Sequence, residues 1–426
     1  MRTGPRLQGT RSLRRVGAAS LLLLGVVTSW LATSRHGYDY MHLYLTTYGV
    51  ASGAPIYDSA WRAEFVPQAC GRSAPGEGVF YPPGTGVAML LLAPLSCGAF
   101  AHVLHVLLIA AVIAGAYWLV KLFKPEAPRG TWVWVAGLVL LSACVRWGMT
   151  HLQSAPLMFG ALALEIAALH GRRPALAALV ACFASALKVT MGPPFVVLLL
   201  MHRRFAAALG VGAVVMVLNA LGFWRMGGAS ALAGYRAAVG SLERAGTINT
   251  ANPLDPQAGI RLDWVALFTG LTGDLSLARL LALGLAVGIG VWLLRTAYRL
   301  PQPLTPRATA ALALPLVCVN LLITYHHAYD VTVLWAPLLP MLLMIGKRLV
   351  RPDWATLLAL PLLAIMALLP IEVTKRLATS LVGDAGMVAL RIAFPVAMTL
   401  ALAASLIHLR SSLQSKPEPD LAAAGV

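Results

Sequence analysis

Residues 99–120 read AFAHVLHVLLIAAVIAGAYWLV, and the run contains no Asp, Glu, Lys or Arg. A helix that crosses about 30 Å of bilayer hydrocarbon needs roughly 20 mainly apolar residues, so this run is long enough to span a membrane. Comparable runs recur along the whole 426-residue chain, of which 59% is hydrophobic and only 12% is charged. Soluble domains carry about twice that charged fraction. The composition therefore predicts an integral membrane protein with several spans.

The predicted spans are helices. Every backbone N–H and C=O group in lipid must be hydrogen-bonded within the protein, which only helices and closed barrels achieve. No segment shows the roughly 10-residue alternation of apolar and polar residues that marks a membrane barrel. We therefore predict an all-α, polytopic membrane protein, a helical bundle of about 10–12 transmembrane helices with two larger extracytoplasmic loops.

The charge distribution sets the expected orientation, because cytoplasmic loops of membrane proteins are enriched in Lys and Arg. Residues 1–15 contain five Arg and no acid, which predicts a basic cytoplasmic N-terminus. Residues 16–408 are predicted to form a single multi-pass domain with outer loops at about 34–85 and 224–277, followed by a cytoplasmic tail at 409–426. The same rule explains the formal net charge of +17, so we expect no nucleic-acid partner.

The predicted spans follow from the apolar runs between these loops. A segment at 86–98, interrupted by Pro94, is expected to lie half-buried ahead of the span at 99–120. Residues 174–201 are too long for one span and short for two, so a short hairpin with Lys188 at its tip is expected. The full set is 16–33, 99–120, 131–150, 154–170, the hairpin, 205–223, 278–296, 308–325, 331–346, 354–371 and 386–408.

The five cysteines show no spacing that is typical of a metal site. Cys144, Cys182 and Cys318 lie in apolar runs, which favours packing in the core. Cys70 and Cys97 could form a disulfide if both faced an oxidising compartment. The chain also lacks a Walker A loop, a GxGxxG motif and an Asp-x-Asp pair for a metal-held nucleotide sugar. We therefore expect no metal and no cofactor.

Asp39 needs an explanation, because charge is scarce in this chain and the residue follows the first apolar run. It lies in the stretch His36-Gly-Tyr-Asp-Tyr-Met-His-Leu-Tyr44, and Tyr40, Tyr44 and Tyr48 are spaced to share one helical face. An interfacial aromatic belt explains these tyrosines as well as sugar stacking does. Asp39 is either a solvated loop residue or, in a partly desolvated setting, a general base.

Several other polar residues are predicted to lie at the same outer face of the membrane. Lys188 would either snorkel to the surface or bind an anion such as a phosphate. Adjacent histidines on a helix point in different directions, so His326 and His327 would contact a phosphate or be solvated rather than share a metal. The residues predicted at this face are Asp39, His151, Gln153, Lys188, His326, His327 and Asp330.

Several short motifs together resemble glycosyltransferase family 87, a family of multi-pass enzymes with the GT-C architecture that includes mannosyl- and arabinofuranosyltransferases. The resemblance covers roughly residues 36–345, with the motifs in the same order. The motifs are Asp39-Tyr-x-x-x-Tyr44, Gly53-Ala-Pro-Ile-Tyr57, Tyr81-Pro-Pro83, His151-Leu-Gln153-Ser154, Ala186-Leu-Lys188 and Tyr325-His326-His327-Ala-Tyr329-Asp330. Where the family often shows Gly-Gln-Asn, this chain has His151 and Ser154 around Gln153.

The resemblance implies a GT-C-type bundle that transfers mannose, another hexose or arabinofuranose from a polyprenyl-phosphate donor to a lipid or glycan acceptor, with inversion. Transfer would occur on the extracytoplasmic face of the bacterial inner (plasma) membrane, in contact with membrane lipids. Asp39 would be the general base for the acceptor hydroxyl, and Lys188 with His326 or His327 would neutralise the leaving phosphate. The substrate-binding residues would be Tyr40, Tyr44, Tyr81, His151, Gln153, Lys188, His326, His327 and Asp330.

Two other functions stay open at this stage. A transporter or flippase for a lipid-linked or anionic substrate is disfavoured because the polar residues share one face and no internal repeat is evident. A non-catalytic membrane assembly subunit would be favoured if Asp39, Lys188 and His326 lay far apart in the fold. The sequence makes no prediction about the oligomeric state.

Overall fold

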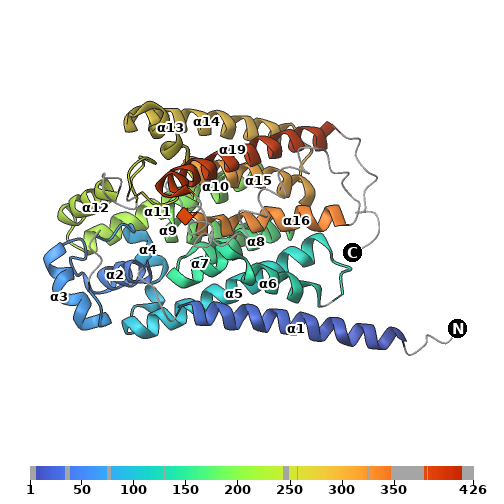
Figure 1. Ribbon diagram of the computed structural model, residues 1–426, viewed down its shortest axis with the longest axis horizontal. Coiled ribbons are helices and arrows are strands. Elements are labelled where there is room, and N and C mark those ends of the chain that lie inside the picture. The colour runs from blue at the N-terminus through green and yellow to red at the C-terminus, as the bar shows by residue number, and fades with distance from the viewer. Residues whose placement is uncertain are drawn as a thin grey trace.

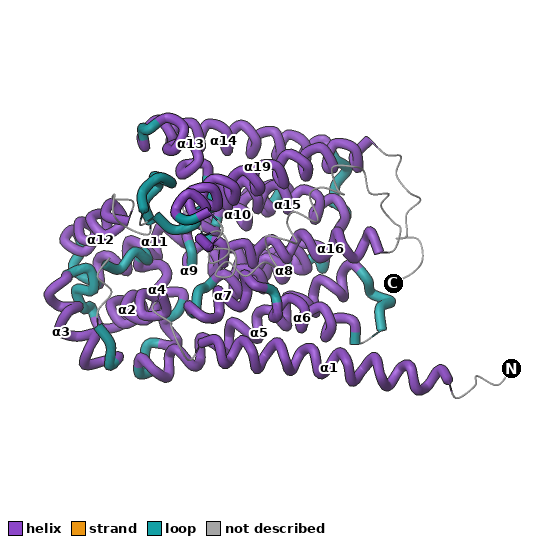
Figure 2. The backbone as a smooth tube through the Cα atoms, in the orientation of Figure 1, coloured by secondary structure: helices purple, strands orange, loops and turns teal. Residues whose placement is uncertain are grey.

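The computed structural model of this chain describes most of its residues. The described ranges are 6–33, 39–73, 78–128, 130–242, 249–256, 258–323, 327–346, 379–380 and 382–414. Over these ranges the chain forms helices joined by loops and turns, with no strand (Figure 2). The all-α, polytopic fold predicted from the sequence is confirmed. The expected span at 354–371 and the candidate residue His326 lie outside the described residues.

Five helices of the described chain are long and apolar enough to cross a membrane. They are α5 (Cys97–Phe123), α11 (Phe205–Arg225), α14 (Leu275–Arg299), α15 (Pro306–Ile323) and α19 (Asp384–Gln414). Shorter apolar stretches lie in α1 (Arg6–Thr33), α8 (Ala155–His170), α9 (Pro174–Leu187), α10 (Pro193–Met201) and α16 (Trp335–Gly346). The total of about 10–12 spans stays a prediction, because a short helix does not by its length alone qualify as a span.

The predicted span at 131–150 is not one straight helix, because the helix breaks at Ser142. Its two halves together are still long and apolar enough for a broken span. Helices α6 (Thr131–Leu141) and α7 (Ala143–His151) meet there at a bend of 64°. Ser142 is extended, and its hydroxyl donates to the carbonyl of Val139 at 2.6 Å and accepts from the indole N–H of Trp335 at 3.2 Å. Side-chain competition for backbone groups of this kind favours a helix end over a helix interior.

Both predicted outer loops contain helices in the structure. The first holds α2 (Asp39–Ser52), α3 (Ser59–Cys70) and α4 (Pro83–Ala88), and the second holds α12 (Ala229–Leu242) and α13 (Trp264–Thr272). Helix α3 has ordinary end signals, since Asp58 accepts from the Trp61 N–H at 2.9 Å and Gly71 closes the helix in the left-handed conformation.

Helices α2, α3, α4 and α12 gather at one end of the bundle, on the left of Figure 1, away from the start of α1. We call this region the α2 end. The two predicted outer loops meet there, because the rings of Tyr57 and Tyr235 lie 5.7 Å apart. The half-buried segment expected at 86–98 is present as the end of α4 and a short 3₁₀ turn, η1 (Leu90–Leu92), ahead of α5.

The break expected at Lys188 is confirmed. Helix α9 stops at Leu187, Lys188 is extended, and η2 (Val189–Met191) leads into α10. The buried hydroxyl of Thr85 donates to the carbonyls of Ala186 and Leu187, at 3.2 Å in each case. These carbonyls belong to the last turn of α9, where carbonyl groups have no hydrogen-bond donor within the helix. Helix α4 therefore fixes the point at which Lys188 leaves the helix.

Helix α4 also presses closely on α2. A Cβ atom added at Gly86 would lie 2.4 Å from the carbonyl oxygen of Thr46, a distance that only glycine permits. The α2–α4 contact therefore leaves α2 little room to shift. Helix α4 contacts the end of α9 as well. It therefore fixes the position of α2, which begins at Asp39, relative to Lys188, although 149 positions separate the two residues in the sequence.

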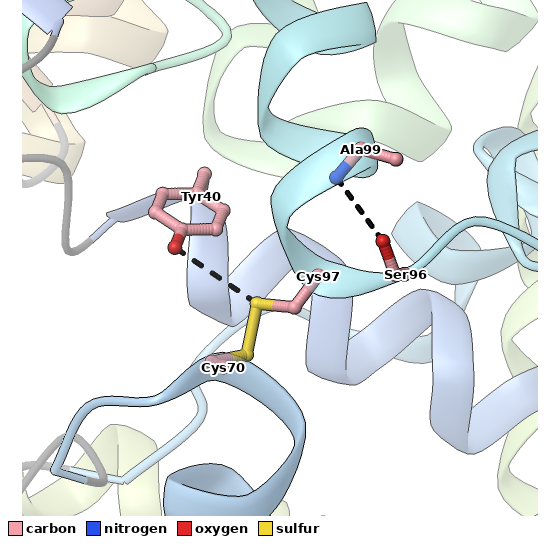
Figure 3. Close-up of a disulfide and its surroundings, with 5 residues drawn as sticks. All are labelled: Tyr40, Cys70, Ser96, Cys97 and Ala99. Carbon is pink, nitrogen blue, oxygen red and sulfur yellow. Dashed lines mark hydrogen bonds between the residues drawn. A yellow bond between two sulfur atoms is a disulfide. The ribbon is translucent and has the colours of Figure 1, made fainter.

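A disulfide joins Cys70, the last residue of α3, to Cys97, the first residue of α5 (Figure 3). The sequence had left this pairing open. The hydroxyl of Tyr40 on α2 lies 3.9 Å from Cys97 Sγ and donates to it. The disulfide thus joins α3 to α5 next to the first turn of α2, where Asp39 is located.

Replacing both Cys70 and Cys97 by alanine is expected to destabilise the α2 end by about 3.5 kcal/mol, because the disulfide closes a loop that spans 27 positions. Unfolding of the purified protein by SDS measures this loss. Cys182→Ala, at a free and half-buried cysteine of α9, is the matched control. Equal unfolding midpoints for the double variant and the control would contradict the expectation.

Candidate functional site

Asp39 begins α2, and its carboxylate lies close to the last residue of α7 and to the turn after it. Asp39 Oδ2 accepts a hydrogen bond from Gln153 Nε2 at 2.5 Å. The same oxygen lies 3.9 Å from His151 Nδ1. The side chains of Asp39 and His151 are 27% and 31% exposed, so both are partly desolvated but still reachable from outside the protein. The prediction that these three residues share one region is confirmed by this geometry.

Gln153 connects Asp39 to the segment before α4. The Tyr81 hydroxyl donates to Gln153 Oε1 at 3.3 Å, and the carbonyl of Tyr81 accepts from the Tyr57 hydroxyl at 2.8 Å. Gln153 is almost fully buried, and both ends of its amide are used. A role in orienting Asp39 therefore explains Gln153 more directly than the substrate contact expected from the sequence.

Lys188 and Asp330 form an ion pair deep in the protein. Lys188 Nζ lies 2.6 Å from Asp330 Oδ1, and the two side chains are only 12% and 2% exposed. Asp330 belongs to η3 (Ala328–Leu334), a 3₁₀ segment at the start of the predicted 331–346 span. The sequence had placed both residues at one face but had not paired them. Removing one partner of a buried pair leaves the other charge uncompensated, which costs more than the pair itself contributes.

Tyr329 connects the Asp39 region with the ion pair. The Lys188 ammonium lies 5.5 Å from the centre of the Tyr329 ring, and the ring of His151 lies 6.4 Å from it on the α7 side. Tyr81 is linked to Asp39 through Gln153, to which its hydroxyl donates. Burial first, and then the carboxylates of Asp39 and Asp330, raise the pKa of Tyr81. Asp39 and the Lys188–Asp330 pair therefore line one region of the protein.

His327 precedes η3 and is the described member of the histidine pair. Its Nδ1 lies 3.3 Å from the carbonyl oxygen of Ile260, so a neutral imidazole there donates through Nδ1. Burial lowers the pKa of His327 to about 4, and the nearby carboxylate of Asp330 opposes this change only in part. Neutralisation of a phosphate by His327 would therefore require protonation of a group that this setting keeps neutral.

Two residues without a predicted role hold this loop in place. Arg261 forms a two-point ion pair with Asp263, with N–O distances of 2.8 and 2.9 Å, and donates to the carbonyl of Asn249 at 2.7 Å. Both charged side chains are buried, and the Arg261 backbone pairs with that of His327 in an antiparallel bridge. The Arg-x-Asp spacing in a membrane protein with few charges was the signal available. The second predicted outer loop thus supports the site.

Tyr40 and Tyr44 occupy a different part of α2. Tyr40 contacts Cys97, and the ring of Tyr44 lies 5.6 Å from that of Phe100 and 6.1 Å from that of Tyr48. Both tyrosines are buried. Their contacts are with α5 and within α2, so a packing role accounts for both tyrosines. A substrate contact stays a prediction.

His42 is a further buried residue of α2, outside the set of predicted site residues. Its ring lies 4.3 Å from Phe80 and 6.5 Å from Tyr81, and burial lowers the pKa of His42 to about 4. A neutral imidazole here packs behind Tyr81. Within the described ranges, no group of three or more His, Cys, Asp or Glu residues could hold a metal ion.

Comparison with known proteins gives one family. The model of glycosyltransferase family 87 matches residues 80–324, which is more than half of the chain. Tyr81, His151, Gln153 and Lys188 lie inside the matched segment, whereas Asp39 precedes it. A search of curated proteins found no match. The family confirms the resemblance drawn from the motifs and identifies a membrane glycosyltransferase: the chain belongs to glycosyltransferase family 87.

Proposed function

We propose that this protein transfers a sugar from a polyprenyl-phosphate donor to a hydroxyl of a lipid or glycan acceptor, with inversion at the anomeric carbon. Mannose, another hexose and arabinofuranose are the sugars considered. The observation that carries the proposal is that a reachable carboxylate, Asp39, and a nearly buried cation, Lys188, lie near one side chain, Tyr329. Lys188 lies 5.5 Å from the centre of the Tyr329 ring, and Asp39 is connected to Tyr329 through His151.

Asp39 acts as the general base. The acceptor O–H gives its proton to the Asp39 carboxylate while the acceptor oxygen bonds to the anomeric carbon from the face opposite the phosphate. The bond between that carbon and the phosphate oxygen breaks, and its electron pair leaves with the polyprenyl phosphate. General-base assistance of this type typically contributes roughly 10²–10⁴-fold to the rate.

Lys188 stabilises the leaving phosphate. Its ammonium has three N–H donors, and the bond to Asp330 uses one of them. A phosphate oxygen can therefore take a second donor without breaking the ion pair. A preorganised cation in a poorly hydrated site stabilises developing negative charge more strongly than it would in water. Asp330 keeps Lys188 in place and balances the charge of its ammonium until the donor binds.

Two observations support an extracytoplasmic active site in the bacterial inner membrane. Disulfides persist in oxidising compartments, and the Cys70–Cys97 disulfide lies beside α2. Residues 1–15 are basic, as expected for a cytoplasmic segment, and the start of α1 lies at the other end of the bundle from α2 (Figure 1). The α2 end would then face outward.

The proposal is tested by incubating the purified protein in liposomes with polyprenyl phosphates carrying ¹⁴C-labelled mannose, glucose or arabinofuranose, together with a lipid extract as the acceptor. We expect one donor to yield labelled product and an equal amount of free polyprenyl phosphate. Movement of labelled donor across the bilayer without any new glycosidic bond would instead support a transporter or flippase.

A further inference from the structure

Trp147 fixes the protonation pattern of His151. The two residues are one turn apart on α7, and Trp147 Nε1 lies 2.9 Å from His151 Nε2. An indole nitrogen only donates hydrogen bonds, so His151 Nε2 must accept. A neutral imidazole has one protonated nitrogen, which places the proton of His151 on Nδ1. This nitrogen is the one that lies 3.9 Å from Asp39 Oδ2.

The donors around Asp39 are therefore distributed unevenly between its two oxygens. The Gln153 amide donates to Oδ2, and the N–H of His151 Nδ1 lies nearest the same oxygen. Within the described part of the chain, Oδ1 has no hydrogen-bond partner. The His151 contact is longer than a hydrogen bond, which spans roughly 2.7–3.2 Å, but such contacts often shorten when substrate binds.

We propose that Trp147 and His151 are positioning residues that hold Asp39 by its Oδ2, so that Oδ1 is the atom that receives the acceptor proton. This proposal rests on the function proposed above. His151 does not itself take the proton, because its Nδ1 is already protonated and its Nε2 lone pair is occupied by Trp147. Asp39 keeps the proton on Oδ1 until it passes to water after the product leaves.

The tautomer of His151 can be measured without any substrate. The protein is labelled with ¹⁵N-histidine, placed in liposomes about two pH units above the ordinary imidazole pKa of ~6.5, and studied by solid-state NMR. The His151 signals are assigned from their loss in His151→Asn. We expect His151 to be protonated on Nδ1 in the wild type and the proton to move at least partly to Nε2 in Trp147→Phe. Protonation of His151 on Nε2 in the wild type would overturn the proposal.

Kinetics with the labelled donor that supports transfer separate positioning from a structural role. His151→Phe is expected to lower kcat by roughly 10-fold with little change in the donor KM, since a donor aimed at the catalytic carboxylate is lost. His151→Asn is expected to recover much of this loss, because its amide N–H can occupy the position of Nδ1–H. The kcat of Trp147→Phe is expected to lie between those of His151→Phe and His151→Asn.

His102→Phe, at an exposed histidine of α5, is the matched control, and thermal unfolding checks that each variant is folded. Equal kcat values for His151→Phe and the wild type, in an enzyme that Asp39→Asn inactivates, would refute the positioning role alone. Full activity of Asp39→Asn would refute the function on which the role rests. Equal losses in His151→Phe and His151→Asn would point to a structural role for the ring and also overturn the proposal.

Discussion

Replacing Asp39 by asparagine is expected to lower kcat for sugar transfer by roughly 10²–10⁴-fold, the usual contribution of a general base. An amide accepts the acceptor hydroxyl in a hydrogen bond but does not take its proton. The change preserves size, so the α2–α4 contact and the disulfide should survive. Transfer of labelled sugar at saturating donor, with the donor KM measured in parallel, gives the effect.

Glu64→Gln provides the matched control for this variant. Glu64 is an exposed carboxylate of α3 in the same predicted outer loop, and its removal should leave transfer unchanged. If Asp39→Asn keeps near-normal kcat while unfolding at the same temperature as the wild type, another group must take the proton and the proposed mechanism fails.

Replacing Lys188 by methionine is expected to have the second largest effect. The variant loses the donor that stabilises the leaving phosphate, which typically costs roughly 10²–10³-fold in kcat. It also leaves the Asp330 carboxylate buried at 2% exposure without its cation, so the protein should unfold at a lower temperature. Transfer rates and thermal unfolding are measured together, with Lys121→Met on α5 as the control.

The double variant Lys188→Met/Asp330→Asn separates the two effects. Removing both charges relieves the penalty of a buried carboxylate that has lost Lys188, so the unfolding temperature should recover towards that of the wild type. The kcat should stay low, because the phosphate still lacks its cation. If stability and activity recover together, Lys188 serves the fold and not the phosphate.

The sequence predicted much of the architecture because membrane helices are encoded locally. An uncharged run such as residues 99–120 has few structures available to it in lipid, and α5 covers it with a few residues to spare. The break at Lys188 could also be predicted from the sequence, since a lysine followed by Gly192 and two prolines interrupts an apolar run. Helices α3 and α12 of the outer segments were not predicted, because helices of 12 and 14 residues are too short to give the hydropathy signal of a span.

The site was predictable only as a set of residues on one side of the membrane. Charge counting placed Asp39, Gln153 and Lys188 together, and the structure brings them to one region. The pairing of Lys188 with Asp330, 142 positions away, depends on how η3 packs against the break after α9 and has no local signature. The two hydrogen bonds of the Gln153 amide, to Tyr81 and to Asp39, also have no local signature, because only the folded chain brings these residues together.

The most direct test of the account is a cryo-EM structure of the protein with its polyprenyl-phosphate sugar bound, using Asp39→Asn to prevent turnover. We expect a phosphate oxygen within roughly 2.7–3.2 Å of Lys188 Nζ, and the anomeric carbon between that phosphate and residue 39. A donor phosphate bound away from Lys188, or a sugar whose anomeric carbon faces away from residue 39, would contradict the proposed mechanism.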